Sequence, residues 1–164
     1  MFTHLNKQGK AQMVDVGGKP ESLREATAYG EIQISPTVFR LLKDNRIPKG
    51  DVFAAARLAG IMGAKKTGEL IPLCHPLSLD LVEIDFKLHK KKVVVTAYVK
   101  STGKTGVEME ALTGVSIALL TLYDMCKSVD KGMTITPVYL LKKSGGRSGI
   151  YKRKNTKKTQ RYER

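Results

Sequence analysis

The sequence predicts an α+β domain whose helices cover one face of an antiparallel β-sheet. The strand and helix patterns follow one another in the order strand, helix, helix, strand, strand, helix, strand. Two β-rich runs near the middle of the chain are joined by a short basic turn, which is typical of a hairpin. The long helix after them is apolar on two sides and must therefore be covered on two sides. Elements in this order favour a layered α+β architecture.

The composition fits one soluble domain. The chain has 164 residues, of which 41% are hydrophobic and 27% charged, as in ordinary globular proteins. It has no apolar run long enough to cross a membrane and no signal-peptide core, so we expect a cytoplasmic protein. Cys74 and Cys126 have no zinc-site spacing and are expected to be reduced thiols. No protein-bound metal ion or cofactor is indicated.

The formal net charge of +14 points to an anionic partner. Residues 151–164 hold seven Lys or Arg and one Glu, so we assign residues 1–149 to the domain and residues 150–164 to a basic, disordered tail. Nucleic acid is one alternative partner, but the chain has no Trp and only 6% aromatic residues, which leaves no stacking platform. Another alternative is an assembly protein whose buried helix is only an interface.

In the N-terminal third of the chain, the secondary-structure pattern is weak at first and becomes regular from residue 27. Residues 13–16 alternate as a short strand, and residues 22–25 are interpreted as the start of a turn. Residues 27–34 have the alternation of a strand. Ser35 is a typical N-cap and is followed by proline, which predicts a short helix over residues 37–43.

A second helix is predicted from its N-cap Asp51 to about Lys66. One side of it carries a stripe of small residues: Val52, Ala56, Ala59, Gly60 and Gly63. Glycines weaken a helix, so we expect close packing against another backbone in return. Lys49 lies just before this helix, and Lys65 lies at its end, where a cation suits the helix dipole.

The remaining strands come from three β-rich runs. Residues 79–88 and 93–100 predict an antiparallel hairpin. Residues 134–142 alternate as a last strand, and Pro137 within it suggests a sheet edge. The Gly/Ser loop 143–149 holds two basic residues and either wraps a phosphate or is a flexible exit to the tail.

The central helix is predicted within residues 103–133 and is expected to stop at a left-handed Gly132. Its first apolar side is Leu112, Val115, Leu119, Leu122 and Cys126. Its second side stacks Glu110, Ile117 and Asp124, flanked by Thr113, Leu120 and Lys127. We expect the first side to meet the sheet and the second to meet another subunit, which would shield the ionisable residues.

Two interpretations of Asp124 and Lys127 remain open. They can be an i, i+3 ion pair that only stabilises the helix. They can also be a general acid/base pair whose pKa values burial moves toward neutrality. His75, between two prolines in an apolar segment, is a candidate second proton carrier, although a lone histidine is more often structural.

Six segments occur in an order that resembles a known family. They are residues 13–16, 49–53, 71–77, 102–112, 123–127 and 143–146. No single segment is specific; the loop at residues 103–106, for example, is not a Walker A motif. Together they resemble the cyclic pyranopterin monophosphate synthases of molybdenum cofactor biosynthesis, over about residues 3–149.

The resemblance implies a ferredoxin-like subunit in a homohexamer, a trimer of dimers, with active sites at a dimer interface. It implies a cofactor-free lyase that acts on 3′,8-cyclo-7,8-dihydroguanosine 5′-triphosphate. A radical S-adenosylmethionine GTP 3′,8-cyclase would supply that substrate. The products would be cyclic pyranopterin monophosphate and pyrophosphate.

The resemblance also implies the site residues. The catalytic set is Lys49, His75, Glu110, Asp124 and Lys127. The substrate-binding set is Arg24, Lys65, Leu73, Cys74, His75, Glu108, Met109, Glu110 and Lys143. Cations suit a triphosphate. Glu108 and Glu110 would fall on nearly opposite sides of a helix that starts at Val107, so either the helix starts later or they serve different partners. We expect Lys49 and His75 from one subunit and Asp124 and Lys127 from its partner.

Overall fold

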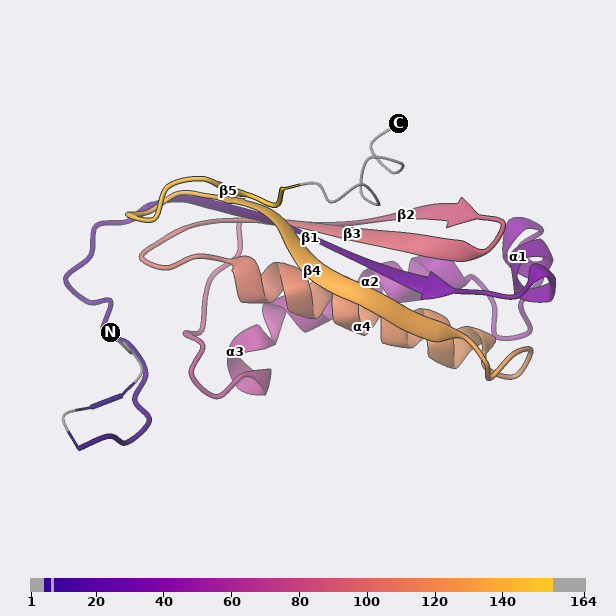
Figure 1. The fold of residues 1–164 in the computed structure, drawn as a ribbon, viewed down its shortest axis with the longest axis horizontal. Coiled ribbons are helices and arrows are strands. Elements are labelled where there is room, and N and C mark those ends of the chain that lie inside the picture. Colours follow the sequence, from indigo (N-terminus) through magenta and orange to yellow (C-terminus); the bar gives the residue numbers. More distant parts are fainter. Residues whose placement is uncertain (1–4, 7, 155–164) are drawn as a thin grey trace.

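The computed structural model describes residues 5–6 and 8–154, in which the two long helices lie on one face of a single sheet and a short helix lies at one end of it (Figure 1). The elements are β1 (Ser22–Gln33), α1 (Pro36–Lys43), α2 (Val52–Lys65), α3 (Thr67–Leu70), β2 (Leu81–His89), β3 (Lys92–Gly103), α4 (Glu108–Cys126), β4 (Thr134–Ser144) and β5 (Tyr151–Lys152). The predicted order of strands and helices is confirmed, but α3 and β5 were not predicted, and β5 lies in the region that was assigned to a disordered tail.

The sheet has the order β2-β3-β1-β4-β5, and its neighbouring strands are all antiparallel. β1 and β3 pair along their full length, from Ser22 opposite Gly103 to Gln33 opposite Lys92. The βαββαβ connectivity with β1 and β3 at the centre is the ferredoxin-like arrangement, which confirms the predicted fold class. β5 pairs only with Lys142 and Lys143, so β4 is an edge strand at Pro137, as predicted.

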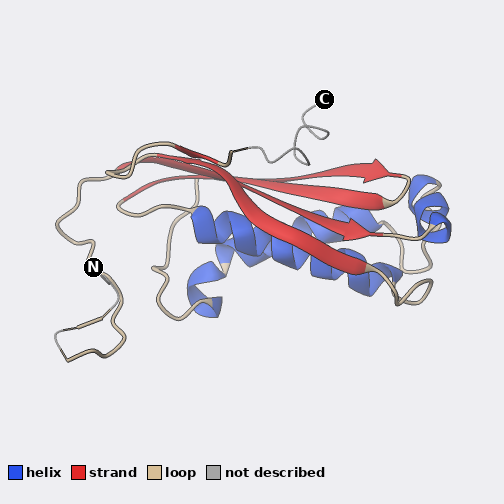
Figure 2. Cartoon of the chain, viewed as in Figure 1, coloured by secondary structure: helices blue, strands red, loops and turns tan. Residues whose placement is uncertain are grey.

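The core lies between the sheet and the helix layer (Figure 2). α4 packs under β1, β3 and β4, while α2 lies beside it and under β2. Gly30 of β1 permits the close approach of α4, because a Cβ there would lie 2.6 Å from side-chain atoms of Val115 and Leu119. The predicted first apolar side of α4 thus faces the sheet, with Val115, Leu119, Leu122 and Cys126 buried.

The second side of α4 meets α2 of the same chain. A Cβ on Gly60 would lie 3.0 Å from the Gly114 carbonyl oxygen, and one on Gly63 would lie 2.7 Å from Ile117. The stripe of small residues therefore does let another backbone approach closely. That backbone belongs to α4, however, so the expectation that the second side meets another subunit is wrong at Ile117.

The helix caps follow the sequence signals. The Ser35 hydroxyl accepts a hydrogen bond from the Val38 amide at 3.4 Å, and the Asp51 carboxylate accepts one from the Ala54 amide at 3.0 Å. These bonds satisfy amide groups that have no partner inside the helix. The starts of α1 and α2 are therefore confirmed to within a residue.

Three local predictions are wrong. Residues 22–25 pair with β3 and belong to β1 rather than to a turn. Residues 13–16 are extended but form no strand, since no neighbouring strand pairs with them among the described residues. The central helix ends at Cys126, and Gly132 does not have a positive φ. The Asp130 carboxylate instead accepts the Gly132 amide hydrogen at 2.7 Å, an Asx turn that reverses the chain after the helix.

One helix, α4, is long and apolar enough to cross a membrane by length and composition alone. The sequence-based expectation was that the chain has no such run. The contacts of α4 account for its composition, because it packs against the sheet on one side and against α2 on another, and a helix covered on two sides in a globular core needs apolar residues on both.

Candidate active site

The predicted site residues fall into two groups, one at each end of α4. Asp124 and Lys127 lie at its C-terminal end, and Glu108 and Glu110 lie in its first turn. Fourteen residues of helix separate Glu110 from Asp124, which corresponds to about 21 Å. One chain therefore does not bring all the predicted residues to a single point.

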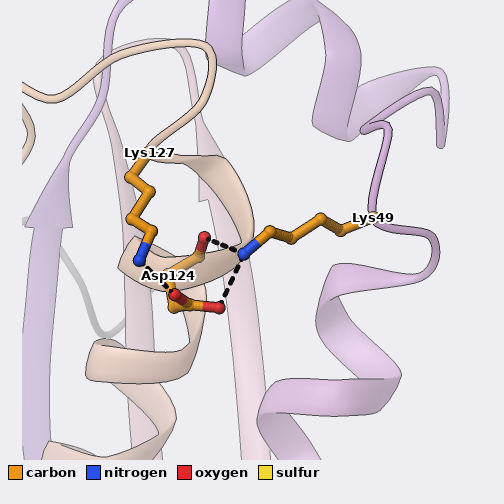
Figure 3. Close-up of polar contacts among 3 residues, drawn as sticks. All are labelled: Lys49, Asp124 and Lys127. Carbon is orange, nitrogen blue, oxygen red and sulfur yellow. Dashed lines mark hydrogen bonds and ion pairs between the residues drawn. The ribbon is translucent and has the colours of Figure 1, made fainter.

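The group at the C-terminal end is an ion-pair triad (Figure 3). Lys127 Nζ lies 2.6 Å from Asp124 Oδ1. Lys49 Nζ lies 2.8 Å from Asp124 Oδ2 and donates a second hydrogen bond, at 3.0 Å, to the Asp124 carbonyl oxygen. Lys49 precedes α2, which runs antiparallel to α4, so the start of one helix meets the end of the other.

This triad corrects two expectations. Lys49 and Asp124 are in contact within one chain, so they are not contributed by different subunits. The second concerns the pKa values of Asp124 and Lys127, and within one chain 53% of the Asp124 side chain is exposed. Hydrogen bonds from Lys127 and then Lys49 lower the pKa of Asp124 to about 2, and the bond to Asp124 raises the pKa of Lys127. The two pKa values move apart rather than toward neutrality, because the mutual attraction outweighs desolvation.

The group at the N-terminal end of α4 surrounds a cavity of about 330 Å³. The predicted residues on its wall are Leu73, Cys74, His75, Glu108, Met109 and Glu110. Val14, Val16, Lys19, Leu77, Thr105 and Gly106 complete it. We refer to it as the ring cavity, because its lining mixes apolar side chains with a few polar groups, as sites for small heterocycles do.

Glu108 and Glu110 both line the ring cavity, which answers the question left open by their spacing. α4 begins at Glu108, so both glutamates lie in its first turn. The Glu108 carboxylate folds back over Gly106, where a Cβ would overlap it. A larger residue at this position would therefore make the Glu108 carboxylate move from its present place in the cavity wall.

Glu110 is the buried ionisable group of this cavity. The residue is 3% exposed, and its Oε2 has no hydrogen-bond partner among the described residues. Burial, with a smaller contribution from Glu108, raises its pKa to about 7. The carboxyl group can therefore hold or release a proton near neutral pH. Burial and then Glu110 also raise the pKa of the Cys74 thiol, which disfavours a thiolate there.

His75 is oriented by a backbone contact. Its Nε2 lies 2.8 Å from the Val14 carbonyl oxygen. Since a carbonyl oxygen only accepts, Nε2 carries the hydrogen, and Nδ1 is the nitrogen that remains for proton transfer. The extended segment 13–16, which sequence analysis interpreted as a strand, thus orients this histidine.

A second cavity, of about 710 Å³, adjoins the first and is basic. Lys19, Arg24, Lys104 and Arg147 line it, and Ser22, Glu108, Gly146 and Ser148 lie among them. Lys19, Thr105, Gly106 and Glu108 line both cavities. We refer to it as the basic cavity. The Ser22 hydroxyl there has no hydrogen-bond partner among the described residues.

The basic cavity contains residues that the sequence analysis did not assign. Arg24 was predicted, and Lys143 donates a hydrogen bond to Ser148 on the cavity wall. Lys19, Lys104 and Arg147 were missed, although the basic Gly/Ser loop was a signal for Arg147. Lys65 ends α2 and lines neither cavity. In the described part of the chain, no cluster of three His, Cys, Asp or Glu side chains could hold a metal ion.

Comparison with known proteins assigns the family. The MoaC family profile matches residues 13–146. The chain belongs to the MoaC family. The match spans β1 to β4 and the whole lining of the ring cavity, but it ends before Arg147 and Ser148 of the basic cavity and before β5.

Members of the MoaC family with curated names are similar along their whole length. The cyclic pyranopterin monophosphate synthase of Peptoclostridium acidaminophilum is 52% identical over 94% of this chain and 98% of its own. The protein of the same name from Natranaerobius thermophilus is 54% identical over 90% of this chain and 94% of its own. The protein of the same name from Geobacillus thermodenitrificans is 52% identical over 93% of this chain and 97% of its own.

Proposed function

We propose that this MoaC family chain is a cyclic pyranopterin monophosphate synthase, a lyase of molybdenum cofactor biosynthesis. Its substrate is 3′,8-cyclo-7,8-dihydroguanosine 5′-triphosphate, and its products are cyclic pyranopterin monophosphate and pyrophosphate. A radical S-adenosylmethionine GTP 3′,8-cyclase supplies the substrate, and the enzyme is cytoplasmic. The curated names of relatives that match almost end to end support this proposal.

The observation that carries the proposal is the pairing of the two cavities. The ring cavity offers carboxyl groups and a histidine among apolar side chains, which suits a flat heterocycle with several N–H groups and a carbonyl. The basic cavity offers four cationic side chains, which suit a chain of phosphates. Because they share part of their walls, one molecule with a heterocycle at one end and a triphosphate at the other fills both.

The residues divide the chemistry between them. Lys19, Arg24 and Arg147 of the basic cavity hold the phosphates and stabilise the charge that develops as pyrophosphate leaves. Glu110, whose pKa of about 7 lets it gain or lose a proton near neutral pH, and His75 Nδ1, the ring nitrogen not bonded to Val14, exchange protons with the heterocycle. Lys49, Asp124 and Lys127 add a second acid/base group, which reaches the heterocycle from a neighbouring subunit.

The length of α4 supports a site shared between two chains. The triad lies about 21 Å from the ring cavity of its own chain. Between them the helix layer exposes Leu58, Met62 and Leu120, each more than half exposed, with relative accessibilities of 64%, 58% and 55%. A two-fold contact over this apolar surface would place the triad of each chain over the ring cavity of the other. The proposed assembly is a homohexamer built as a trimer of such dimers.

Product analysis tests the proposed function. The protein is mixed with substrate generated from GTP by a purified 3′,8-cyclase, and mass spectrometry follows both products. Cyclic pyranopterin monophosphate and pyrophosphate should form in equal amounts, and only in the presence of the protein. Thermal stabilisation by oligonucleotides but not by GTP, with no product formed, would contradict the proposal and favour nucleic-acid binding.

A further inference from the structure

Residues 14–20 cross both cavities. Val14 and Val16 line the ring cavity, Pro20 lines the basic cavity, and Lys19 lines both. We call residues 14–20 the crossing segment. Lys19 is only partly exposed, while most of the segment is exposed, so its side chain turns toward the protein at the junction of the cavities.

Two side chains tie the crossing segment to the domain. His75 Nε2 donates a hydrogen bond to the Val14 carbonyl oxygen at 2.8 Å, and Lys104 Nζ donates one to the Gly17 carbonyl oxygen at 2.7 Å. Among the described residues, no further hydrogen bond joins the segment to the rest of the domain. These two bonds, together with the packing of half-buried Val14 and Val16, hold the segment over the cavities.

The crossing segment is internally compact. The Lys19 amide donates to the Val16 carbonyl oxygen at 3.1 Å, and the Gly17 amide donates to the Asp15 carboxylate at 2.7 Å. This turn fixes Lys19 relative to the Gly17 carbonyl group. A bond that holds Gly17 therefore also places Lys19.

We propose that Lys104 is a positioning residue that acts through the Gly17 carbonyl group to hold Lys19 at the junction of the two cavities. There Lys19 binds the phosphate nearest the heterocycle. This inference rests on the proposed function for the identity of that phosphate. The contact between Lys104 and the crossing segment does not depend on the reaction.

A set of variants tests the inference in the full chain. Lys104→Met removes the donor, and Lys104→Arg keeps one. Lys19→Met and the double variant test whether the two lysines act together. Lys90→Met, in the exposed β2–β3 turn, is the matched control. Hydrogen exchange over residues 13–20 is measured without substrate, and KM and kcat are measured with it.

The inference predicts a specific pattern. Lys104→Met speeds exchange over residues 13–20 by about fivefold to tenfold and raises KM about tenfold with little change in kcat. Lys104→Arg restores both values, and Lys90→Met changes neither. The double variant has no higher KM than the worse of the two single variants, because both remove the same phosphate contact.

Two results would overturn the inference. Unchanged exchange in Lys104→Met would mean that the Gly17 contact does not hold the segment. Effects on KM that multiply in the double variant would mean that Lys104 binds substrate independently of Lys19. If the unmodified protein forms no product, the proposed function fails separately. Hydrogen exchange then still tests whether Lys104 holds the crossing segment. The affinity for inorganic triphosphate, measured by calorimetry, replaces KM.

Discussion

The carboxyl group of Glu110 is buried, which disfavours its charged form. Burial raises its pKa to about 7, so in the folded chain it stays protonated at pH values where the unfolded chain has lost the proton. A group whose folded pKa exceeds its unfolded pKa contributes stability at low pH and loses it as the pH rises. This stability is lost as the pH rises from about 4.5 to about 7.

Glu110→Gln should therefore remove a pH dependence. The free energy of unfolding of the unmodified protein should fall, relative to that of the variant, by roughly 2 kcal/mol between pH 5 and pH 8. Urea titration at the two pH values measures the difference. The same change at Glu69, which is exposed, should leave the pH dependence unaltered. A constant difference between the protein and Glu110→Gln at both pH values would show that Glu110 is ionised throughout.

Lys127→Ala should abolish product formation while the melting temperature changes little, because the side chain is half exposed. Lys127→Arg is the matched control. Arginine can keep the ion pair with Asp124, but it does not release a proton at working pH. Both variants should be inactive if Lys127 transfers a proton. Activity in Lys127→Arg would favour the alternative in which Lys127 only pairs with Asp124.

Residue-level sequence reasoning identified the groups but not their environments. The spacing of Glu110, Asp124 and Lys127 placed them along one helix, but it could not distinguish buried Glu110 from exposed Asp124. That distinction depends on which parts of α4 the sheet, α2 and the crossing segment cover. Lys49 gave no signal of its contact with Asp124, because the pair is joined only by the packing of α2 on α4.

At the scale of elements, the α2–α4 contact decides where the site groups lie. Gly60 faces Gly114 at the crossing, and the helices run antiparallel from there to Lys49 and Asp124. A larger separation of the helices would draw Lys49 away from Asp124. The contact therefore couples the packing of two helices to the geometry of the triad.

Gly60→Ala should destabilise the fold even though alanine is the better helix former. Its Cβ would lie 3.0 Å from a backbone oxygen, which cannot rotate away. Overpacking of this kind costs about 1–3 kcal/mol, against about 1 kcal/mol gained in helix propensity. Denaturant unfolding measures the net loss, and Ala54→Ser on the exposed side of α2 should stay within about 0.5 kcal/mol of the unmodified protein. A more stable Gly60→Ala would show that the helices can separate without cost.

The elements themselves were largely readable from the sequence. Caps at Ser35 and Asp51, the hairpin alternation and the small-residue stripe each have a local cause, and each was confirmed. The misassigned stretches lack such a cause. Residues 22–25 become a strand only because β3 extends to Gly103 beside them, and residues 13–16 are held through Val14 by His75, which is distant in the sequence.

At the scale of the whole molecule, the basic C-terminal region should be dispensable for catalysis. β5 lies at the sheet edge and pairs only with Lys142 and Lys143, away from both cavity linings. A chain that ends at Lys154 keeps β5 and should retain near-normal kcat. Residues 155–164, for which disorder was predicted, lie outside the described residues. A large loss of kcat at saturating substrate would assign the removed residues a role in the site.

The whole-molecule question is whether one substrate is served by two chains. His75 lies at the ring cavity and Asp124 at the far end of α4, so His75→Ala and Asp124→Ala should damage opposite halves of a shared site. Unfolding the two inactive variants together and refolding them should leave a quarter of the sites intact, and about a quarter of the activity should return. Lys49→Ala mixed with Asp124→Ala is the matched control, because Lys49 contacts Asp124 within one chain, and this mixture should stay inactive. If both mixtures stay inactive while mass measurement confirms subunit exchange, then His75 and Asp124 do not act on one substrate from different chains.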